Sequence, residues 1–204
     1  MFKNINRKST PKVIGGVVLR KNNHKKTANY WNTFQKDVII DIEKPGKGYK
    51  HFLKKRDVLK FIEIIPNWGE ISKYLDAIVL ASANIGCDGY YNNDGVICLS
   101  AWEKEMDIWV KEHYYNDHQE LFSRLGVKAT EKENNIFYCE FNEDQIKAYQ
   151  LLHVLLHELG HHVDRIKTKS KITAARGEKF AEDYAFEYEK IIWKKYQETF
   201  KVIF

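Results

Sequence analysis

Apolar residues follow two different patterns along the chain. Through the first two thirds they form short runs between turn residues, and in the last third they recur every three or four positions. Short runs bounded by turn signals predict strands, whereas a sustained spacing of three to four predicts amphipathic helices. Strands first and long helices last is the pattern of an α+β fold.

The short runs define the first predicted elements. Pro66 ends one helical stretch because proline lacks the N–H that a helix needs, and Gly126 ends another. Residues 86–95 are rich in glycine and asparagine and predict a turn region. The predicted strands are Asp37–Ile42, Leu75–Ala83, Val96–Trp102 and Ile136–Phe141, and the third is expected to pair with the second. The predicted helices are Asp57–Ile65, Glu103–Tyr115 and His118–Leu125.

The clearest element is a long helix that begins after Asn142. Asparagine is a good N-cap, and Gln145 three residues later completes a capping box. One face of this helix is predicted to carry Ile146, Tyr149, His153, Leu156, His157, Gly160, His161 and Asp164. After a basic loop at Lys167–Lys171, a second helix is expected from about Thr173 to Phe200. Its apolar stripe consists of Ala181, Tyr184, Ala185, Tyr188 and Ile192.

The long helix contains the motif H-E-x-x-H, from His157 to His161. Four residues advance a helix by about 40° beyond one full turn and by roughly 6 Å, so both imidazoles can reach one ion. Such pairs bind zinc at about 2.0–2.1 Å. Glu158 leaves the helix next to the first histidine and can reach a metal-bound water, which makes it the candidate general base. The competing interpretation is a pair of core histidines with ordinary hydrogen bonds.

A catalytic zinc site needs a third protein ligand. The second helix supplies two carboxylates one turn apart, Glu178 and Glu182. At this spacing one can bind the metal while the other orients a ligand histidine. The apolar neighbours of this segment favour a partly buried position over a solvated face. We therefore expect one zinc ion per chain, held by His157, His161 and one of these glutamates.

The two motifs together resemble the gluzincin arrangement of zinc peptidases. The branch that is most similar includes anthrax lethal factor and the bacterial Pro-Pro endopeptidases, which show H-E-x-x-H-x-x-D followed by an E-F-F-A-E-type helix. The likeness covers roughly residues 142–190. It implies a zincin-like fold, Glu178 as the third ligand, and Glu182 and Asp164 as groups that support the ligands.

The resemblance also implies metal-assisted hydrolysis of a peptide or protein substrate. In the mechanism that the resemblance implies, Glu158 takes a proton from the zinc-bound water and passes it to the leaving amine. One feature departs from the family, which has a tyrosine for the oxyanion shortly before the glutamate ligand. Residues 163–177 contain no tyrosine, so Tyr184, Tyr188, Arg176 or a residue further upstream would have to substitute. The strand near Val96–Ser100 offers either an exposed edge to an extended peptide or an ordinary interior strand.

Charge divides the chain into two parts. Residues 1–60 contain 16 Lys/Arg and 4 Asp/Glu, a balance of +12, and the remaining 17 Lys/Arg and 24 Asp/Glu give −7, which together make the total of +5. We expect residues 1–36 to be a basic, partly flexible arm and 37–204 to be the zincin-like domain. The basic N-terminal third, residues 1–60, is either solvated or a contact for nucleic acid, an anionic surface or an acidic partner.

The remaining composition bears on location and on alternative functions. No apolar run reaches the roughly 20 residues of a transmembrane helix, and no export signal is evident, so a cytoplasmic protein without membrane contact is expected. Three cysteines without a C-x-x-C pair favour reduced thiols. A binding module that keeps the zincin fold and a hydrolase for non-peptide amides remain alternatives. Of the other histidines, His153 is expected in the core and His113, His118 and His162 at the surface.

Overall fold

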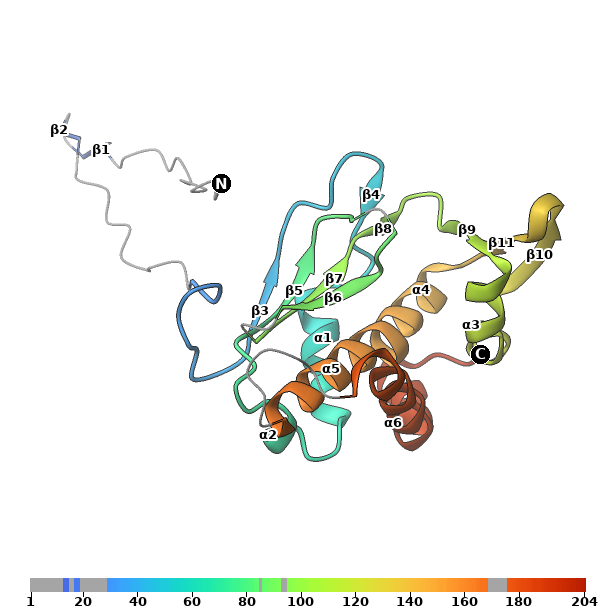
Figure 1. Ribbon diagram of the computed structural model, residues 1–204. Coiled ribbons are helices and arrows are strands. Elements are labelled where there is room, and N and C mark those ends of the chain that lie inside the picture. The colour runs from blue at the N-terminus through green and yellow to red at the C-terminus, as the bar shows by residue number, and fades with distance from the viewer. Residues whose placement is uncertain (1–12, 15–16, 19–28, 85, 93–94, 169–175) are drawn as a thin grey trace.

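The computed structural model describes residues 13–14, 17–18, 29–84, 86–92, 95–168 and 176–204. Its centre is a four-stranded sheet in the order β3 (Ile39–Ile42), β5 (Ala77–Ala81), β7 (Val96–Ser100), β6 (Gly89–Asn92) (Figure 1). β3, β5 and β7 run parallel, and β6 is antiparallel to β7. The predicted mixture of strands and helices is confirmed, and so is the pairing of the second and third predicted strands.

Alternation along β5 and β7 separates two apolar layers. Ile78 and Leu80 of β5, with Ile97 and Leu99 of β7, face the main core beneath the helices. The intervening residues of both strands face a smaller cluster on the other side, which contains Tyr30. Because both faces of these strands are covered, they read as continuous apolar runs.

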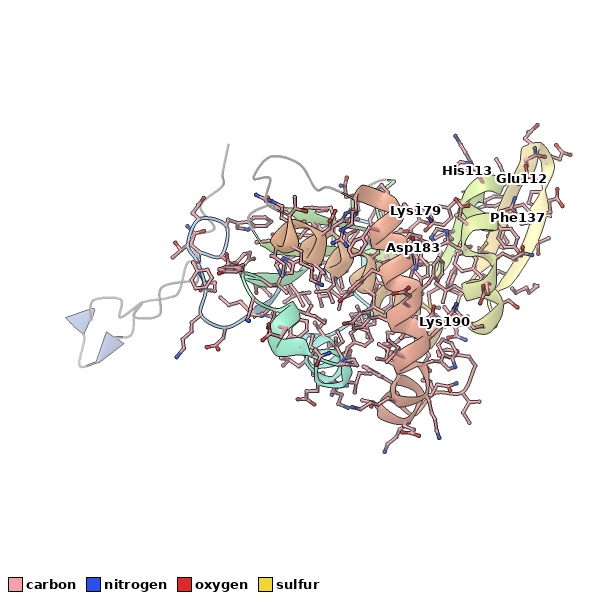
Figure 2. The ribbon with its side chains drawn as sticks, turned by 60° about the horizontal axis from the view of Figure 1, so that its bottom comes forward. Glu112, His113, Phe137, Lys179, Asp183 and Lys190 are labelled. Carbon is pink, nitrogen blue, oxygen red and sulfur yellow. The ribbon has the colours of Figure 1, made fainter. Side chains whose placement is uncertain are left out.

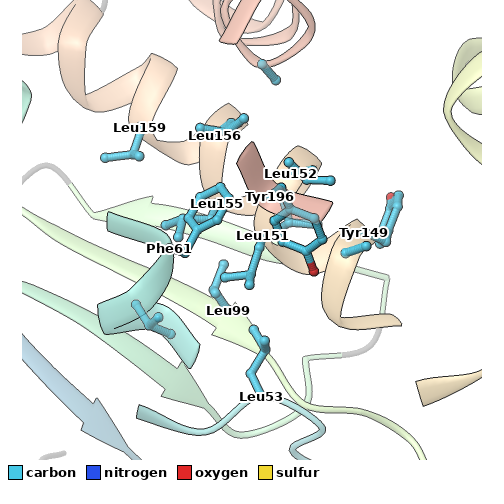
Figure 3. Packing of buried hydrophobic residues seen from close by; sticks show 14 of the residues in the cluster. Leu53, Phe61, Leu99, Tyr149, Leu151, Leu152, Leu155, Leu156, Leu159 and Tyr196 are labelled. Atoms are coloured by element: carbon cyan, nitrogen blue, oxygen red, sulfur yellow. The ribbon is translucent and has the colours of Figure 1, made fainter. Parts of the chain in front are cut away.

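One helical run lies across the sheet. It consists of α4 (Glu143–Tyr149), a π-helical segment (Gln150–Leu155) and α5 (Leu156–Lys167). The predicted capping box is confirmed, since Asn142 Oδ1 accepts from the backbone N–H of Gln145 at 2.9 Å and Gln145 Oε1 accepts from that of Asn142 at 2.7 Å. Figure 3 shows how leucines of this run pack with the sheet and neighbouring helices; the labelled ones are Leu151, Leu152, Leu155, Leu156 and Leu159.

The last helix, α6 (Gly177–Phe200), packs beside this run and carries the predicted apolar stripe. Its outer face is charged, with Lys179, Asp183 and Lys190 exposed (Figure 2). The beginning predicted at Thr173 lies outside the described residues. Two shorter helices, α1 (Lys55–Ile64) and α2 (Trp68–Ile71), connect β4 (Tyr49–Lys50) to β5, and α1 confirms the predicted first helix.

A second, antiparallel sheet lies in the order β10 (Lys128–Lys132), β11 (Ile136–Glu140), β9 (Asp107–Lys111), with a short 3₁₀ turn at Glu133–Asn135. α3 (Glu112–Arg124) packs on it through the stacked rings of Tyr115 and Phe137, whose centroids are 4.0 Å apart. Arg124 at the end of α3 donates to the buried Glu189 of α6 at 2.6 Å. β4 pairs with β8 (Trp102–Glu103), and β1 (Val13–Ile14) pairs with β2 (Val17–Val18).

Two predicted elements need correction, and one open alternative is decided. The helix expected at Glu103–Tyr115 is wrong over most of its length, because β9 occupies its middle and pairs with β11. The turn region expected at residues 86–95 contains β6. Of the two alternatives for Val96–Ser100, the structure shows the interior strand, since β7 lies between β5 and β6, and the edges of this sheet belong to β3 and β6.

The part of the predicted arm next to the sheet is ordered against it. Tyr30 is buried, and its hydroxyl donates to Asp41 Oδ2 at 3.0 Å. The backbone N–H of Gln35 donates to Asp76 Oδ1 at 2.6 Å. The nucleic-acid prediction rests on the basic residues 1–60, and most of residues 1–28 lie outside the described residues. No helix in the described part of the chain is long and apolar enough to cross a membrane.

Candidate metal centre

Three donor atoms from two helices converge at one end of α5. His161 Nε2 lies 3.1 Å from His157 Nε2, and Glu178 Oε2 of α6 lies 3.2 Å from His157 Nε2 and 3.4 Å from His161 Nε2. A tetrahedral zinc ion with bonds of about 2.0–2.1 Å has its ligands about 3.3–3.4 Å apart. The three donors therefore have the separation that such an ion requires, without rearrangement of either helix.

Access to these donors is open. The side chain of Glu178 is 84% exposed, whereas those of His157 and His161 are 18% and 17% exposed. One side of the donor set thus faces solution while the other rests on the protein. A catalytic metal site needs such an open position for water or substrate.

Close packing holds α6 beside α5. A Cβ placed on Gly160 would lie only 2.7 Å from Ala181 Cα and 3.1 Å from Ala181 O. Glycine is therefore required between the two histidines for the helix backbones to approach this far. Ala181 follows Glu178 by less than one turn, so this contact also fixes the distance from Glu178 to the histidines.

Asp164 fastens the beginning of α6. Its Oδ2 accepts from the backbone N–H groups of Arg176 at 2.9 Å and Gly177 at 3.2 Å, and its Oδ1 accepts from Arg176 Nε at 2.8 Å. Asp164 is fully buried, and these donors, Arg176 above all, hold the pKa of its carboxyl below the usual range despite burial. The residue directly after this anchored turn is Glu178. These hydrogen bonds thus give Asp164 a positioning role toward Glu178.

Glu182 forms a hydrogen bond with His157 on the side of the ring away from the three donor atoms. Its Oε2 accepts from His157 Nδ1 at 2.9 Å, which leaves Nε2 of the same ring directed at the donor set. Carboxylates commonly orient zinc-binding histidines in this way. Burial lowers the pKa of His157, but hydrogen bonding to Glu182 and the charges of Glu158 and Glu178 outweigh it, so this pKa is raised. Burial dominates at His161, whose pKa is lowered.

Glu158 lies between the helix and the edge strand β6. Its side chain is nearly buried, and the backbone N–H of Tyr91 in β6 donates to it. Burial raises the pKa of Glu158 to about 7, an effect that the nearby Glu178 strengthens and His157 opposes. Gly89 of the same strand packs against Glu158, since an added Cβ would lie 3.4 Å from Glu158 Cγ and 2.6 Å from Val154 Cγ1.

A cavity of about 210 Å³ lies beside Glu158 and His157. Its other lining groups include Asp88, Tyr114 and Tyr149, which the sequence did not single out. Asp88 Oδ2 accepts from the hydroxyl of Tyr114 at 2.5 Å and from that of Tyr149 at 3.1 Å, and the two hydroxyls also contact each other. Only the position of Tyr149 on the predicted face of the motif helix hinted at this arrangement.

The residues proposed to replace the missing tyrosine are occupied elsewhere. The Arg176 guanidinium carbon lies 3.5 Å from the centre of the Phe180 ring, and its Nε donates to Asp164. Tyr184 is buried, with its ring stacked on that of Tyr188 at a centroid distance of 4.4 Å. Tyr114 and Tyr149 are upstream residues whose hydroxyls lie in the same cavity wall as Glu158.

Two of the four predictions for the other histidines are wrong. His162 is fully buried, because the helix is covered on this side as well; its Nδ1 contacts the Tyr91 hydroxyl at 3.2 Å and its Nε2 donates to the Lys73 carbonyl at 3.0 Å. His118 is half-buried and packs on His153. His153 is in the core, as predicted, and His113 is exposed at the start of α3 (Figure 2).

Comparison with known proteins adds no relative to this picture. No protein-family model, no curated protein and no solved structure matches the chain. The residues of the candidate metal centre are therefore the basis for inferring the protein's function.

Proposed function

We propose that this protein is a zinc-dependent peptidase of the zincin type, which hydrolyses peptide bonds with Glu158 as general base. The observation that carries the proposal is the convergence of His157 Nε2, His161 Nε2 and Glu178 Oε2 at separations of 3.1–3.4 Å. Two imidazoles and a carboxylate are the donor set of gluzincin sites, and one face of this set is open.

A zinc ion held by these three residues would supply Lewis-acid chemistry, polarising the scissile carbonyl and lowering the pKa of water. The protein's own part begins with Glu158, whose side chain lies next to His157 on the same helix and lines the cavity beside it. From there Glu158 accepts the proton of the attacking water and returns it to the leaving amine. Glu182 keeps His157 in the tautomer whose Nε2 is free to bind a metal, and Asp164 positions Glu178 through the backbone at the beginning of α6.

The edge strand β6 supports a peptide as substrate. β6 pairs with β7 on one side, and no described strand pairs with its other side. Its residues Gly89 and Tyr91 contact Glu158, so an extended peptide added along this edge passes the general base. Addition of a strand gives main-chain hydrogen bonds that do not depend on the peptide's sequence.

The proposal is tested by peptide cleavage in the full-length protein. A peptide library is incubated with the zinc-loaded protein, with the chelated protein and with the chelated protein after zinc is restored. Cleavage that disappears on chelation and returns with zinc supports the proposal. Glu178→Ala should abolish both zinc binding and cleavage, whereas Glu187→Ala, at an exposed glutamate on the same helix, should change neither. Cleavage that persists in the chelated protein or in the Glu178→Ala variant would refute it.

A further inference from the structure

A second group of metal-ligating side chains lies behind the candidate metal centre. His118 Nε2 of α3 is 2.9 Å from His153 Nε2 of the π-helical segment, and His153 Nε2 is 3.8 Å from Glu182 Oε2 of α6. The three donor atoms all lie within 4.8 Å of one another. All three residues line the cavity beside Glu158, so the group is reached through the same space.

His118 is already oriented as a ligand. Its Nδ1 lies 2.8 Å from the backbone carbonyl of Tyr114, and a carbonyl can only accept a hydrogen bond. The proton of the neutral ring is therefore on Nδ1, and the lone pair of Nε2 points at His153. Metal-binding histidines generally donate their other ring N–H to a carbonyl or a carboxylate, as His157 does to Glu182.

His153 is held in the interior without full hydrogen bonding. Its side chain is 5% exposed, and its Nδ1 has no hydrogen-bond partner among the described residues. The ring thus directs its one engaged nitrogen, Nε2, at both His118 and Glu182. It also lies in a π-helical segment, a local departure from the α-helix that is frequent at functional sites.

We propose that His118, His153 and Glu182 form a second zinc site, distinct from the one at His157, His161 and Glu178. Two imidazoles and a carboxylate suit zinc better than magnesium or calcium, which prefer oxygen ligands. Ligands of a tetrahedral zinc ion are about 3.3–3.4 Å apart, so the 2.9 Å and 3.8 Å separations each differ from this value by about 0.5 Å. The third separation, between His118 Nε2 and the Glu182 carboxylate, is within 4.8 Å, so the half-buried Glu182 side chain must move toward His118 to close the site.

Glu182 joins the two sites. It accepts a hydrogen bond from His157, a ligand of the first ion, and contributes a carboxylate oxygen to the second. A bound ion would replace the contact between His118 Nε2 and His153 Nε2, in which only one of the two rings can donate a hydrogen bond. The number of zinc ions per chain therefore rises from one to two.

The test is the zinc content of the full-length protein after equilibration with zinc chloride and removal of free metal, measured by elemental analysis. We expect two ions per chain in the wild type, one in His118→Gln and one in the double variant His157→Ala/His161→Ala. His113→Ala, at the exposed histidine on the same helix as His118, should retain two. Circular dichroism verifies that each variant is folded.

The outcomes separate the two sites. One ion in the wild type that is kept in His118→Gln and lost in the double variant would overturn the second site and leave the first in place. One ion that is lost in His118→Gln but kept in the double variant would support the second site and contradict the first. If the wild type and His118→Gln both bind two ions, His118 is not a ligand and the second site is overturned. This result can be interpreted as long as His118→Gln is folded.

Discussion

Gly160 gives the sharpest structural prediction, because the motif H-E-x-x-H accepts any residue at this position. Gly160→Ala places a Cβ 2.7 Å from Ala181 Cα, where ordinary carbon contacts are about 3.5–4.0 Å. The two helix backbones must therefore separate by roughly 1 Å. Overpacking of this kind costs about 1–3 kcal/mol, and the better helix propensity of alanine offsets about 1 kcal/mol of it.

The same shift disturbs the candidate metal centre. Zinc sites tolerate about 0.2 Å in ligand distance, and α6 would carry Glu178 away from both histidines by several times that amount. The long, exposed side chain of Glu178 can extend toward the histidines and so compensates for part of this displacement. We expect zinc affinity to fall about 10–100-fold, the usual scale for loss of a supporting contact. Competition with a chromophoric chelator measures the affinity, and urea unfolding of the chelated protein measures the stability.

Two control variants test whether the close contact of α5 and α6 is responsible for the loss of zinc affinity. Gly69→Ala places a Cβ in open space on α2, so zinc affinity should be unchanged. Adding Ala181→Gly to Gly160→Ala should restore little, because the closest atoms of Ala181 are its backbone Cα and O. If Gly160→Ala binds zinc as tightly as the wild type, the close contact of α5 and α6 does not position Glu178.

Two other variants test the supports of α6. Asp164→Asn removes the charge that anchors the beginning of this helix, so it should lower the free energy of unfolding by about 1–3 kcal/mol and weaken zinc binding through Glu178. Urea unfolding measures the free energy and chelator competition measures the zinc affinity. If both quantities equal those of the wild type, Asp164 does not have this role. Burial raises the pKa of Glu189 to about 7, above the ordinary value of 4.5 and against the attraction of Arg124. The folded protein then binds this proton more tightly than the unfolded chain, so the contribution of Glu189 to stability should be complete below pH about 4.5 and should fall by at most about 3 kcal/mol as pH rises through 7. Glu189→Gln should lack this component, and equal pH dependence of urea unfolding in variant and wild type would contradict it.

Local signals predicted the parts of the fold that matter most for the site. The capping box at Asn142 and Gln145, the three-to-four spacing and the two glutamates on the last helix are each visible within a few residues of sequence. They specify helices and the faces that those helices expose. The convergence of Glu178 with His157 and His161 required one further assumption, that the last helix crosses back beside the motif.

Long-range contacts account for the errors. The segment expected to be helical at Glu103–Tyr115 forms β9 because a partner strand, Ile136–Glu140, is available. His162 is buried by partners 71 and 89 residues away, Tyr91 and Lys73. His118 likewise meets His153 across 35 residues. The residue pattern within one segment cannot predict such long-range pairs. The proximity of His118 to His153 therefore emerged only from the three-dimensional structure.

The peptidase proposal is tested most directly at Glu158. Glu158→Gln keeps the size of the side chain and removes its ability to accept a proton, and Glu158 is not among the three donors proposed to bind zinc. Peptide cleavage is compared between wild type and variant at matched zinc content, with Glu187→Gln as a surface control. We predict full zinc occupancy and a loss of cleavage of about 10²–10⁴-fold in Glu158→Gln alone. Equal cleavage by wild type and Glu158→Gln would contradict the proposed mechanism.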